Sequence, residues 1–393
     1  MARKFAAAVA FAAASAPAAA APGDVFHVRA TELPAPFATP ATDNSSIRIA
    51  RPKGAMPRAP KGFAVSIFAS GLDDPRFMAM APNGDVFLSE PRQGRVLLLH
   101  DGKASVFAAG FDRPHGLAFR DGQLYVGDLN AVWSMPWSSG GMQPMHRAQV
   151  TYDGFGARGG HSTRDIAIGR DGTLYVAIGS MGNVGEEKPP RATVQKVDGE
   201  GRLSTFAGGL RNPVGIAFYP GTNDLYVTVN ERDGYGDGLV PDYLTRIGQG
   251  DFFGWPYAYV GPHPDPVFGK KRPDLVAKTR TPDVLFQAHS APLGLAFYDG
   301  TQFPAEYRGD AFVALHGSWN SGKPTGYKVV RVRFDHGRPV GTYQDFLTGF
   351  WDGHSSPARV WGRPAGLLVA KDGSLLVSDD VGNVVWRVAY AGR

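Results

Sequence analysis

The chain has 393 residues, a length that suits either two ordinary domains or one large domain built from repeats. It contains no cysteine, which excludes disulfide bonds, thiolate metal sites and a cysteine nucleophile. The formal net charge of +5 is mild and the Lys and Arg residues are scattered, so a nucleic-acid partner is not indicated.

Residues 1–21 have the pattern of a secretory signal peptide. Arg3 and Lys4 precede a short Ala-rich apolar stretch, which ends in small residues just before Pro22. The stretch is too short to span a bilayer, and no later segment is long and apolar enough to do so. We therefore expect cleavage near Ala21, a mature chain without a transmembrane span, and a periplasmic or secreted location.

Residues 22–60 are rich in Ala, Pro and Thr, a composition that predicts disorder. From residue 61 to residue 393 the pattern changes. Long helical periodicity is absent there, and short apolar runs alternate with Asp-Gly or Asn-Gly pairs, which is the signature of β-hairpins. We expect this region to form one all-β domain.

One hairpin unit occurs six times in that region. Each copy opens with a turn, continues with an apolar run, and is followed by a second turn and a second apolar run. The copies open at Asp74, Arg113, His161, Arg211, His289 and Arg363. The first spacings match the length of a four-stranded blade, and wider later spacings leave room for loops such as 261–280. The repeat predicts a six-bladed β-propeller, closed by pairing of residues 62–68 with residues 384–388.

The turn before each innermost strand of a propeller lies beside the central channel, so the opening residues should meet at one mouth. They include Arg76, His115, His161, Arg211, His289 and Arg363, with Arg164 and Arg359 in support. Guanidinium groups offer forked donors that match carboxylates, so such a mouth suits a flat ligand with several negative charges. The alternative is structural: the arginines pair with nearby Asp74, Asp112 or Asp165.

Two local patterns suggest chemistry. His161 follows Gly159 and Gly160, so it lies on a tight turn, where an imidazole can act as a general base near neutral pH. A structural role is the alternative for this histidine, as it is for His289 and His316. The oxygen-rich, glycine-rich loop 230–244 has the composition of a calcium-binding loop, although solvated turns often share that composition.

These motifs, taken in order, resemble the glucose/sorbosone dehydrogenase family, and most closely its sorbosone or pyranose dehydrogenase branch. The resemblance covers about residues 60 to 390. The motifs that carry it are Arg113-Pro-His-Gly-Leu-Ala-Phe, Gly160-His-Ser-Thr-Arg, Gly209-Leu-Arg-Asn-Pro-Val-Gly, Asn230-Glu-Arg-Asp, Phe253-Gly-Trp-Pro-Tyr, His289-Ser-Ala-Pro-Leu-Gly and Leu315-His-Gly-Ser-Trp-Asn.

The resemblance implies a dehydrogenase that uses pyrroloquinoline quinone (PQQ) and Ca²⁺. It would oxidise an aldose or sorbosone-type sugar to a lactone or acid and pass electrons to a quinone or a cytochrome. By this resemblance His161 is the catalytic base, and Arg211 and Asn212 polarise and hold the cofactor. Arg363 and Arg359 bind the carboxylates of the cofactor. The carbonyl oxygens near Asp233 and Gly234 bind calcium. His115 and His289, as repeat openers, complete the expected cofactor-binding set.

One departure from the family pattern concerns the base. Ser180 stands where the glucose branch has an aspartate that orients the histidine, so His161 either lacks a carboxylate partner or borrows Asp165. Two other functions stay open. A gluconolactonase-like hydrolase would need Glu, Asn and Asp around a bare metal, where this chain offers His and Arg. A non-catalytic propeller that binds carbohydrate or protein agrees with Ser180.

Overall fold

The computed structural model describes residues 21–100, 103–144, 146, 148–155, 159–198 and 200–392. Of the predicted signal peptide, residues 1–20 lie outside this range. Within the described residues, no helix has both the length and the apolar character needed to cross a membrane.

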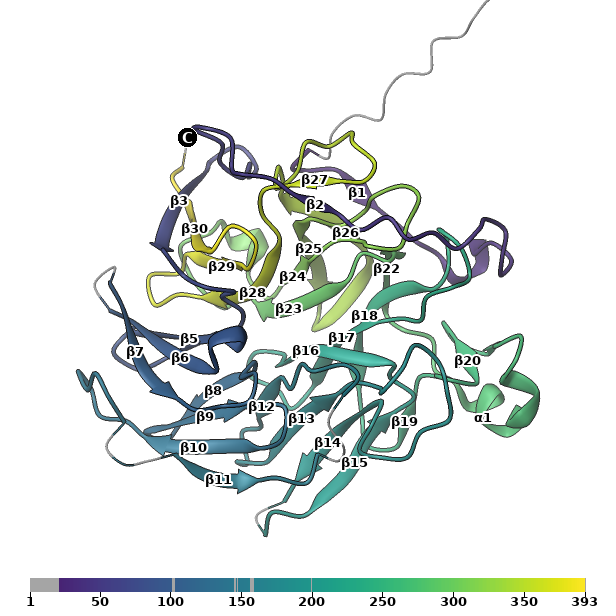
Figure 1. Ribbon diagram of the computed structural model, residues 1–393, viewed down its shortest axis with the longest axis horizontal. Coiled ribbons are helices and arrows are strands. Elements are labelled where there is room, and N and C mark those ends of the chain that lie inside the picture. The colour runs from purple at the N-terminus through teal and green to yellow at the C-terminus, as the bar shows by residue number, and fades with distance from the viewer. Residues whose placement is uncertain are drawn as a thin grey trace, which may run out of the picture.

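Six sheets are arranged around a central axis (Figure 1), each built mainly from antiparallel strands and each beginning with its innermost strand. The first three blades are β4 (Met78–Met80), β5 (Val86–Glu90), β6 (Arg95–His100) and β7 (Lys103–Ala109); β8 (Leu117–Arg120), β9 (Gln123–Gly127), β10 (Val132–Pro136) and β11 (Gln149–Tyr152); and β12 (Ile166–Ile168), β13 (Leu174–Ile178), β14 (Thr193–Val197) and β15 (Leu203–Gly208), with β19 (Asp251–Phe252) added in parallel.

The other three blades complete the ring. They are β16 (Asn212–Phe218), β17 (Leu225–Asn230), β18 (Pro241–Ile247) and β22 (Val284–Ala288); β23 (Pro292–Phe297), β24 (Ala311–Leu315), β25 (Lys328–Asp335) and β26 (Arg338–Leu347), with β1 (Val25–Phe26) at the outer edge; and β28 (Pro364–Val369), β29 (Leu375–Asp379), β30 (Val384–Tyr390) and β3 (Phe63–Ser70).

Short elements decorate the blades. The β2 (Ile47–Arg48) and β27 (Arg359–Val360) pair is parallel, and the β20 (Ala258–Tyr259) and β21 (His263–Pro264) pair is antiparallel. The helical elements are the helix α1 (Pro273–Lys278) and the 3-10 turns η1 (Ala30–Glu32), η2 (Pro91–Gln93), η3 (Gly269–Lys271) and η4 (Ala305–Tyr307). The predicted loop 261–280 therefore contains α1 and η3.

The predicted six-bladed propeller is confirmed. The innermost strands contact one another in the order β4, β8, β12, β16, β23, β28 and back to β4. The ring closes as expected, because β3 pairs with β30 from Phe63 opposite Tyr390 to Ser70 opposite Val384. Closure of this kind leaves no open sheet edge between the first and last blades.

The core lies between neighbouring blades. In the fifth blade the second strand, β24, is an unbroken apolar run, and every one of its residues is buried. Phe87 and Val96 of the first blade pack with Leu124 and Val126 of the second in one cluster. The apolar runs of the repeat therefore serve two purposes, since they form the strands and also bind one blade to the next.

The prediction of disorder for residues 22–60 is wrong for the described part of that segment. Val25 pairs with Gln344 at the edge of the fifth blade, and β2 lies beside β27. Apolar side chains of this segment, such as Val28 and Ile49, pack against the hydrophobic clusters of the propeller. The backbone groups of the segment also find partners on the finished propeller, which offsets the entropy of ordering.

Candidate active site

A pocket of about 560 Å³ opens where the innermost strands begin. Five of the predicted opening residues line it together: Arg76, His161, Arg211, His289 and Arg363. They lead into the innermost strands of five different blades, so the fold brings together residues that lie up to 287 positions apart in the sequence. The pocket therefore combines guanidinium and imidazole groups at one mouth of the channel.

Three expected members of this mouth lie elsewhere. His115 is 5% exposed and not in the pocket lining; its Nδ1 lies 2.8 Å from the Arg113 carbonyl oxygen. Arg164 is fully buried, and its Nη1 donates to the carbonyl oxygens of His161 and Thr163. Arg359 is exposed on β27, which pairs with β2, and it is not in the pocket lining. The expectation that they line the mouth is corrected, because repeat position alone does not decide which way a side chain points.

His161 is oriented by the main chain. Its Nδ1 lies 2.9 Å from the Ser180 carbonyl oxygen and 3.1 Å from Ser180 Oγ. A carbonyl can only accept a hydrogen bond, so Nδ1 carries the proton and Nε2 keeps its lone pair. The expectation that Asp165 assists is wrong, because the Asp165 carboxylate accepts from the backbone N–H groups of Ile166 and Ile216.

The surroundings keep this imidazole uncharged. Burial, followed by the positive charge of Arg211, lowers the pKa of His161 to about 4. At neutral pH its Nε2 can therefore accept a proton. Gly179 makes this packing possible: a Cβ there would lie 2.4 Å from Asn212 Oδ1 and 2.6 Å from His161 Cβ.

The Arg211 side chain is fixed by hydrogen bonds to neighbouring residues. Its Nε donates to the Asn183 carbonyl oxygen at 3.0 Å, Nη1 to the Glu231 carbonyl oxygen at 2.8 Å, and Nη2 to Asp233 Oδ2 at 2.9 Å. Its contribution to the pocket is thus a fixed positive charge more than a set of free donors. The neighbouring Asn212 also lines the pocket, and its buried Oδ1 has no hydrogen-bond partner among the described residues.

Another part of the pocket lining comes from the first, fifth and sixth blades. Asp380 accepts from Arg76 Nη1 at 2.5 Å and lies 2.9 Å from His316 Nε2. Arg363 donates from Nε to the His316 carbonyl oxygen and from Nη2 to the Gly317 carbonyl oxygen. The Nε of Arg76 is buried and has no partner among the described residues. Two of the arginines pair with carboxylates that were not named from the sequence, Arg76 with Asp380 and Arg211 with Asp233.

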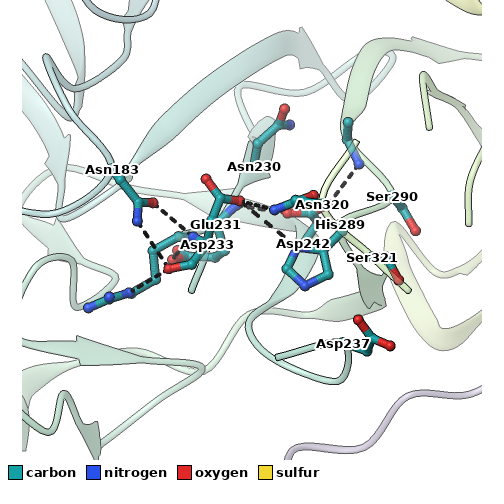
Figure 2. Close-up of polar contacts among 12 residues, drawn as sticks. Asn183, Asn230, Glu231, Asp233, Asp237, Asp242, His289, Ser290, Asn320 and Ser321 are labelled. Carbon is teal, nitrogen blue, oxygen red and sulfur yellow. Dashed lines mark hydrogen bonds and ion pairs between the residues drawn. The ribbon is translucent and has the colours of Figure 1, made fainter. Parts of the chain in front are cut away.

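Asp233 links two loops at the rim (Figure 2). Its carboxylate accepts from Asn320 Nδ2 at 2.5 Å, and its backbone exchanges two hydrogen bonds with the Asn183 side chain, N–H to Oδ1 at 2.8 Å and Nδ2 to the carbonyl oxygen at 3.0 Å. Gly234 follows at φ +98°, a left-handed conformation suited to glycine. Across the described ranges, no group of three or more His, Asp or Glu side chains is arranged to hold a metal ion.

His316, considered in the sequence beside His289, also lines the pocket. Some pocket residues were not singled out in the sequence: Glu231, Asp242, Trp319 and Asn320 line it as well. Burial raises the pKa of the Glu231 carboxyl to about 7. Glu231, His316, Trp319 and Asn320 do occur in the motifs quoted above, so the available signal was membership of a motif. Which motif positions reach the pocket depends on the path of the loops.

Comparisons with known proteins agree with this architecture. The model of the TrAA12-like family matches residues 57–237 and 272–391. A Borreliella burgdorferi protein described as uncharacterized is 29% identical over 361 residues, covering 85% of this chain and 90% of that protein.

Solved structures also match along most of the chain. The holo pyranose dehydrogenase PQQ domain from Coprinopsis cinerea has a TM-score of 0.72 at 20% identity, covering 87% of this chain and 98% of that chain. The calcium structure of Trichoderma reesei family AA12 has a TM-score of 0.70 at 19% identity, covering 85% and 97%. The PQQ-bound aldose sugar dehydrogenase from Streptomyces coelicolor has a TM-score of 0.61 at 17% identity, covering 84% and 99%. At these identities the likeness establishes a shared fold.

Proposed function

The chain belongs to the TrAA12-like family, and from this premise we propose that it is a PQQ-dependent oxidoreductase that oxidises an aldose or sorbosone-type sugar to a lactone or an acid. The observation that carries the proposal is the convergence of His161, Arg211 and Arg363 on one pocket. The solved structures with the same fold include a PQQ-bound aldose sugar dehydrogenase and a holo PQQ domain. This supports the choice of cofactor.

The pocket suits that cofactor chemically. PQQ is flat and carries several carboxylates, and three guanidinium groups line a pocket of about 560 Å³. Two buried polar atoms, Arg76 Nε and Asn212 Oδ1, lack partners among the described residues, and a polar ligand would satisfy them. We assign cofactor binding to Arg76, Asn212 and Arg363, with Arg211 supplying a fixed charge.

Residues of the chain would accept the proton that the sugar hydroxyl releases. When bound, PQQ supplies an acceptor for the hydride that leaves the sugar's anomeric carbon. His161 Nε2 accepts the proton of the anomeric hydroxyl, while the Ser180 carbonyl oxygen holds Nδ1 and so fixes the ring. Arg211, held by Asp233 and by main-chain carbonyl oxygens, places positive charge beside the site where negative charge develops.

Calcium is a separate part of the proposal, and the geometry at its expected ligands is less favourable. The Asp233 carbonyl oxygen already accepts from Asn183, and the Asp233 carboxylate accepts from Arg211 and Asn320. The turn at Asp233 and Gly234 therefore does not present a preformed set of oxygen ligands. Calcium binding there would require these hydrogen bonds to rearrange, and we derive no catalytic step from it.

One experiment tests the central claim. Purified protein is titrated with PQQ in the presence of calcium or of a chelator, and the visible spectrum is followed. We expect saturable binding and, with an aldose added, reduction of an artificial dye. Binding without dye reduction would favour a non-catalytic propeller, and acid release from a sugar lactone without quinone would favour a hydrolase. Absence of PQQ binding in both conditions would refute the proposal.

The cellular setting follows from the same proposal. An exported enzyme would pass its electrons to a quinone or a cytochrome outside the cytoplasm. Fractionation of cells that express the full chain tests the location. Recovery of uncleaved protein in the cytoplasmic fraction would contradict it.

A further inference from the structure

The N-terminal segment passes along the rim of the pocket before the first blade begins. In Figure 1 it is the purple trace that runs past the β2 and β27 pair. We call residues 34–48 the strap. They precede residue 57, where the match to the TrAA12-like family model starts.

The strap first contacts the loop 231–240, here the first rim loop, which carries Asp233. The Phe37 N–H donates to the Tyr235 carbonyl oxygen at 2.9 Å, and the two rings meet edge to face at 5.1 Å between centroids. The Asp237 N–H donates to Thr39 Oγ1 at 2.8 Å. At Gly236 a Cβ would lie 2.4 Å from the Thr39 carbonyl oxygen, so the two backbones are in close contact.

The strap next contacts the loop 316–326, here the second rim loop, which carries Trp319 and Asn320. The Asn44 N–H donates to the Trp319 carbonyl oxygen at 2.7 Å. Asn44 Nδ2 donates to the Ser321 carbonyl oxygen at 2.7 Å and to Ser356 Oγ at 2.9 Å. One residue therefore holds the backbone on both sides of Asn320.

The two rim loops also meet each other, and pocket residues lie at the junction. Asn320 Nδ2 donates to Asp233 Oδ1 at 2.5 Å, and the Gly322 N–H donates to Asp237 Oδ1 at 2.8 Å. Figure 2 shows Asn320 directed toward Asp233. Asp237 thus connects the first rim loop to the second rim loop and, through its N–H, to Thr39 of the strap.

Burial does not fix the Trp319 side chain, which lines the pocket and is 49% exposed, whereas Ser318, Asn320 and Ser321 beside it are buried. Gly317 (φ +100°) and Gly326 (φ +82°) flank the loop with backbone that is intrinsically permissive. The Ser318 N–H donates to the Thr325 carbonyl oxygen at 2.9 Å inside the loop. The hydrogen bonds from Asn44 add a restriction from outside the loop, on both sides of Asn320.

We propose that the strap is a positioning element of the ligand site and that Asn44 is its main positioning residue. Asn44 fixes the backbone of Trp319 and Ser321, and this places the Trp319 and Asn320 side chains at the pocket. The ligand part of this inference rests on the proposed function. The structural part does not, because it concerns the order of the rim loops in the unliganded protein.

The test compares Asn44→Ala with Ser45→Ala in the full chain. Ser45 is the adjacent residue, and its exposed hydroxyl donates only to Asp43 within the segment. Backbone amide exchange is measured without ligand on peptides that cover the two rim loops. Asn44→Ala keeps the backbone N–H bond to Trp319 but removes the side-chain bonds to the Ser321 carbonyl oxygen in the second rim loop and to Ser356 Oγ outside it. Exchange in the second rim loop should therefore become about fivefold faster in Asn44→Ala, and Ser45→Ala should match the wild type.

The ligand arm uses PQQ itself as the probe. We expect its Kd to rise by about fivefold in Asn44→Ala. The turnover number at saturating PQQ and sugar should fall by less than about twofold, because His161 and Ser180 do not contact the strap. If the strap only stabilised the fold, Asn44→Ala would lower the melting temperature but would not raise the Kd of PQQ while leaving the turnover number nearly unchanged.

A second variant keeps the inference testable if Asn44→Ala folds poorly. Thr39→Val keeps the shape of the side chain and removes the acceptor of the Asp237 N–H. It should speed exchange in the first rim loop. Exchange in both variants equal to that of Ser45→Ala would overturn the inference. If wild-type protein binds no PQQ, the proposed function fails while the exchange data still decide the role of the strap.

Discussion

Replacing His161 with asparagine separates its two possible roles, base and structural support. The amide nitrogen of asparagine can occupy the place of Nδ1 and keep the 2.9 Å hydrogen bond to the Ser180 carbonyl oxygen, but it has no counterpart of Nε2. General base catalysis typically contributes a factor of about 10² to 10⁴, so His161→Asn should lower turnover by at least about a hundredfold with PQQ still bound.

Ser180→Ala is the matched comparison. It removes the Oγ contact at 3.1 Å and keeps the carbonyl that orients the ring. A single hydrogen bond of this kind contributes about 1 kcal/mol, so turnover should stay within about fivefold of the wild type. Both variants are assayed by dye reduction at saturating PQQ and aldose, with binding checked by the visible spectrum. Turnover of His161→Asn within threefold of Ser180→Ala would refute the assignment of His161 as base.

Three further outcomes follow from the same geometry. Arg363→Ala should raise the Kd of PQQ by at least about tenfold, because it removes a charged donor; an unchanged value from spectral titration would contradict the clamp. Because the pKa of His161 is lowered to about 4, protonation of Nε2 should abolish activity only as the pH falls toward that value; a rate profile that already declines at pH 6.5 would argue against this base. Gly179→Ala would bring a Cβ within 2.4 Å of Asn212 Oδ1, so it should lower the melting temperature and weaken PQQ binding. Gly182→Ala is the control and should change neither quantity, because no atom lies within 4 Å of a Cβ at that position.

The fold could be predicted because its signals are local. A hairpin turn such as Asp171-Gly172 between apolar runs specifies two paired strands wherever it occurs, and repetition at blade length leaves few alternatives to a propeller. His161 and Arg211 could be placed at one mouth for the same reason, since each lies in the turn that leads into an innermost strand, β12 or β16.

The partners of those residues could not be predicted. Arg76 and Asp380 are 304 positions apart and meet only because the ring closes. His115 occupies a repeat position like that of His161, yet its side chain is buried, and burial lowers its pKa to about 3. Asn44 lies in a segment whose composition predicts disorder, and it is ordered by acceptors on distant loops.

Local sequence thus determined the blades, their number and the residues that open each one, because turn chemistry and strand periodicity act over a few residues. The closed ring decided which of those side chains reach the pocket, which carboxylate pairs with each arginine, and that a main-chain carbonyl orients His161. These outcomes depend on contacts between segments far apart in the chain, which no local pattern encodes.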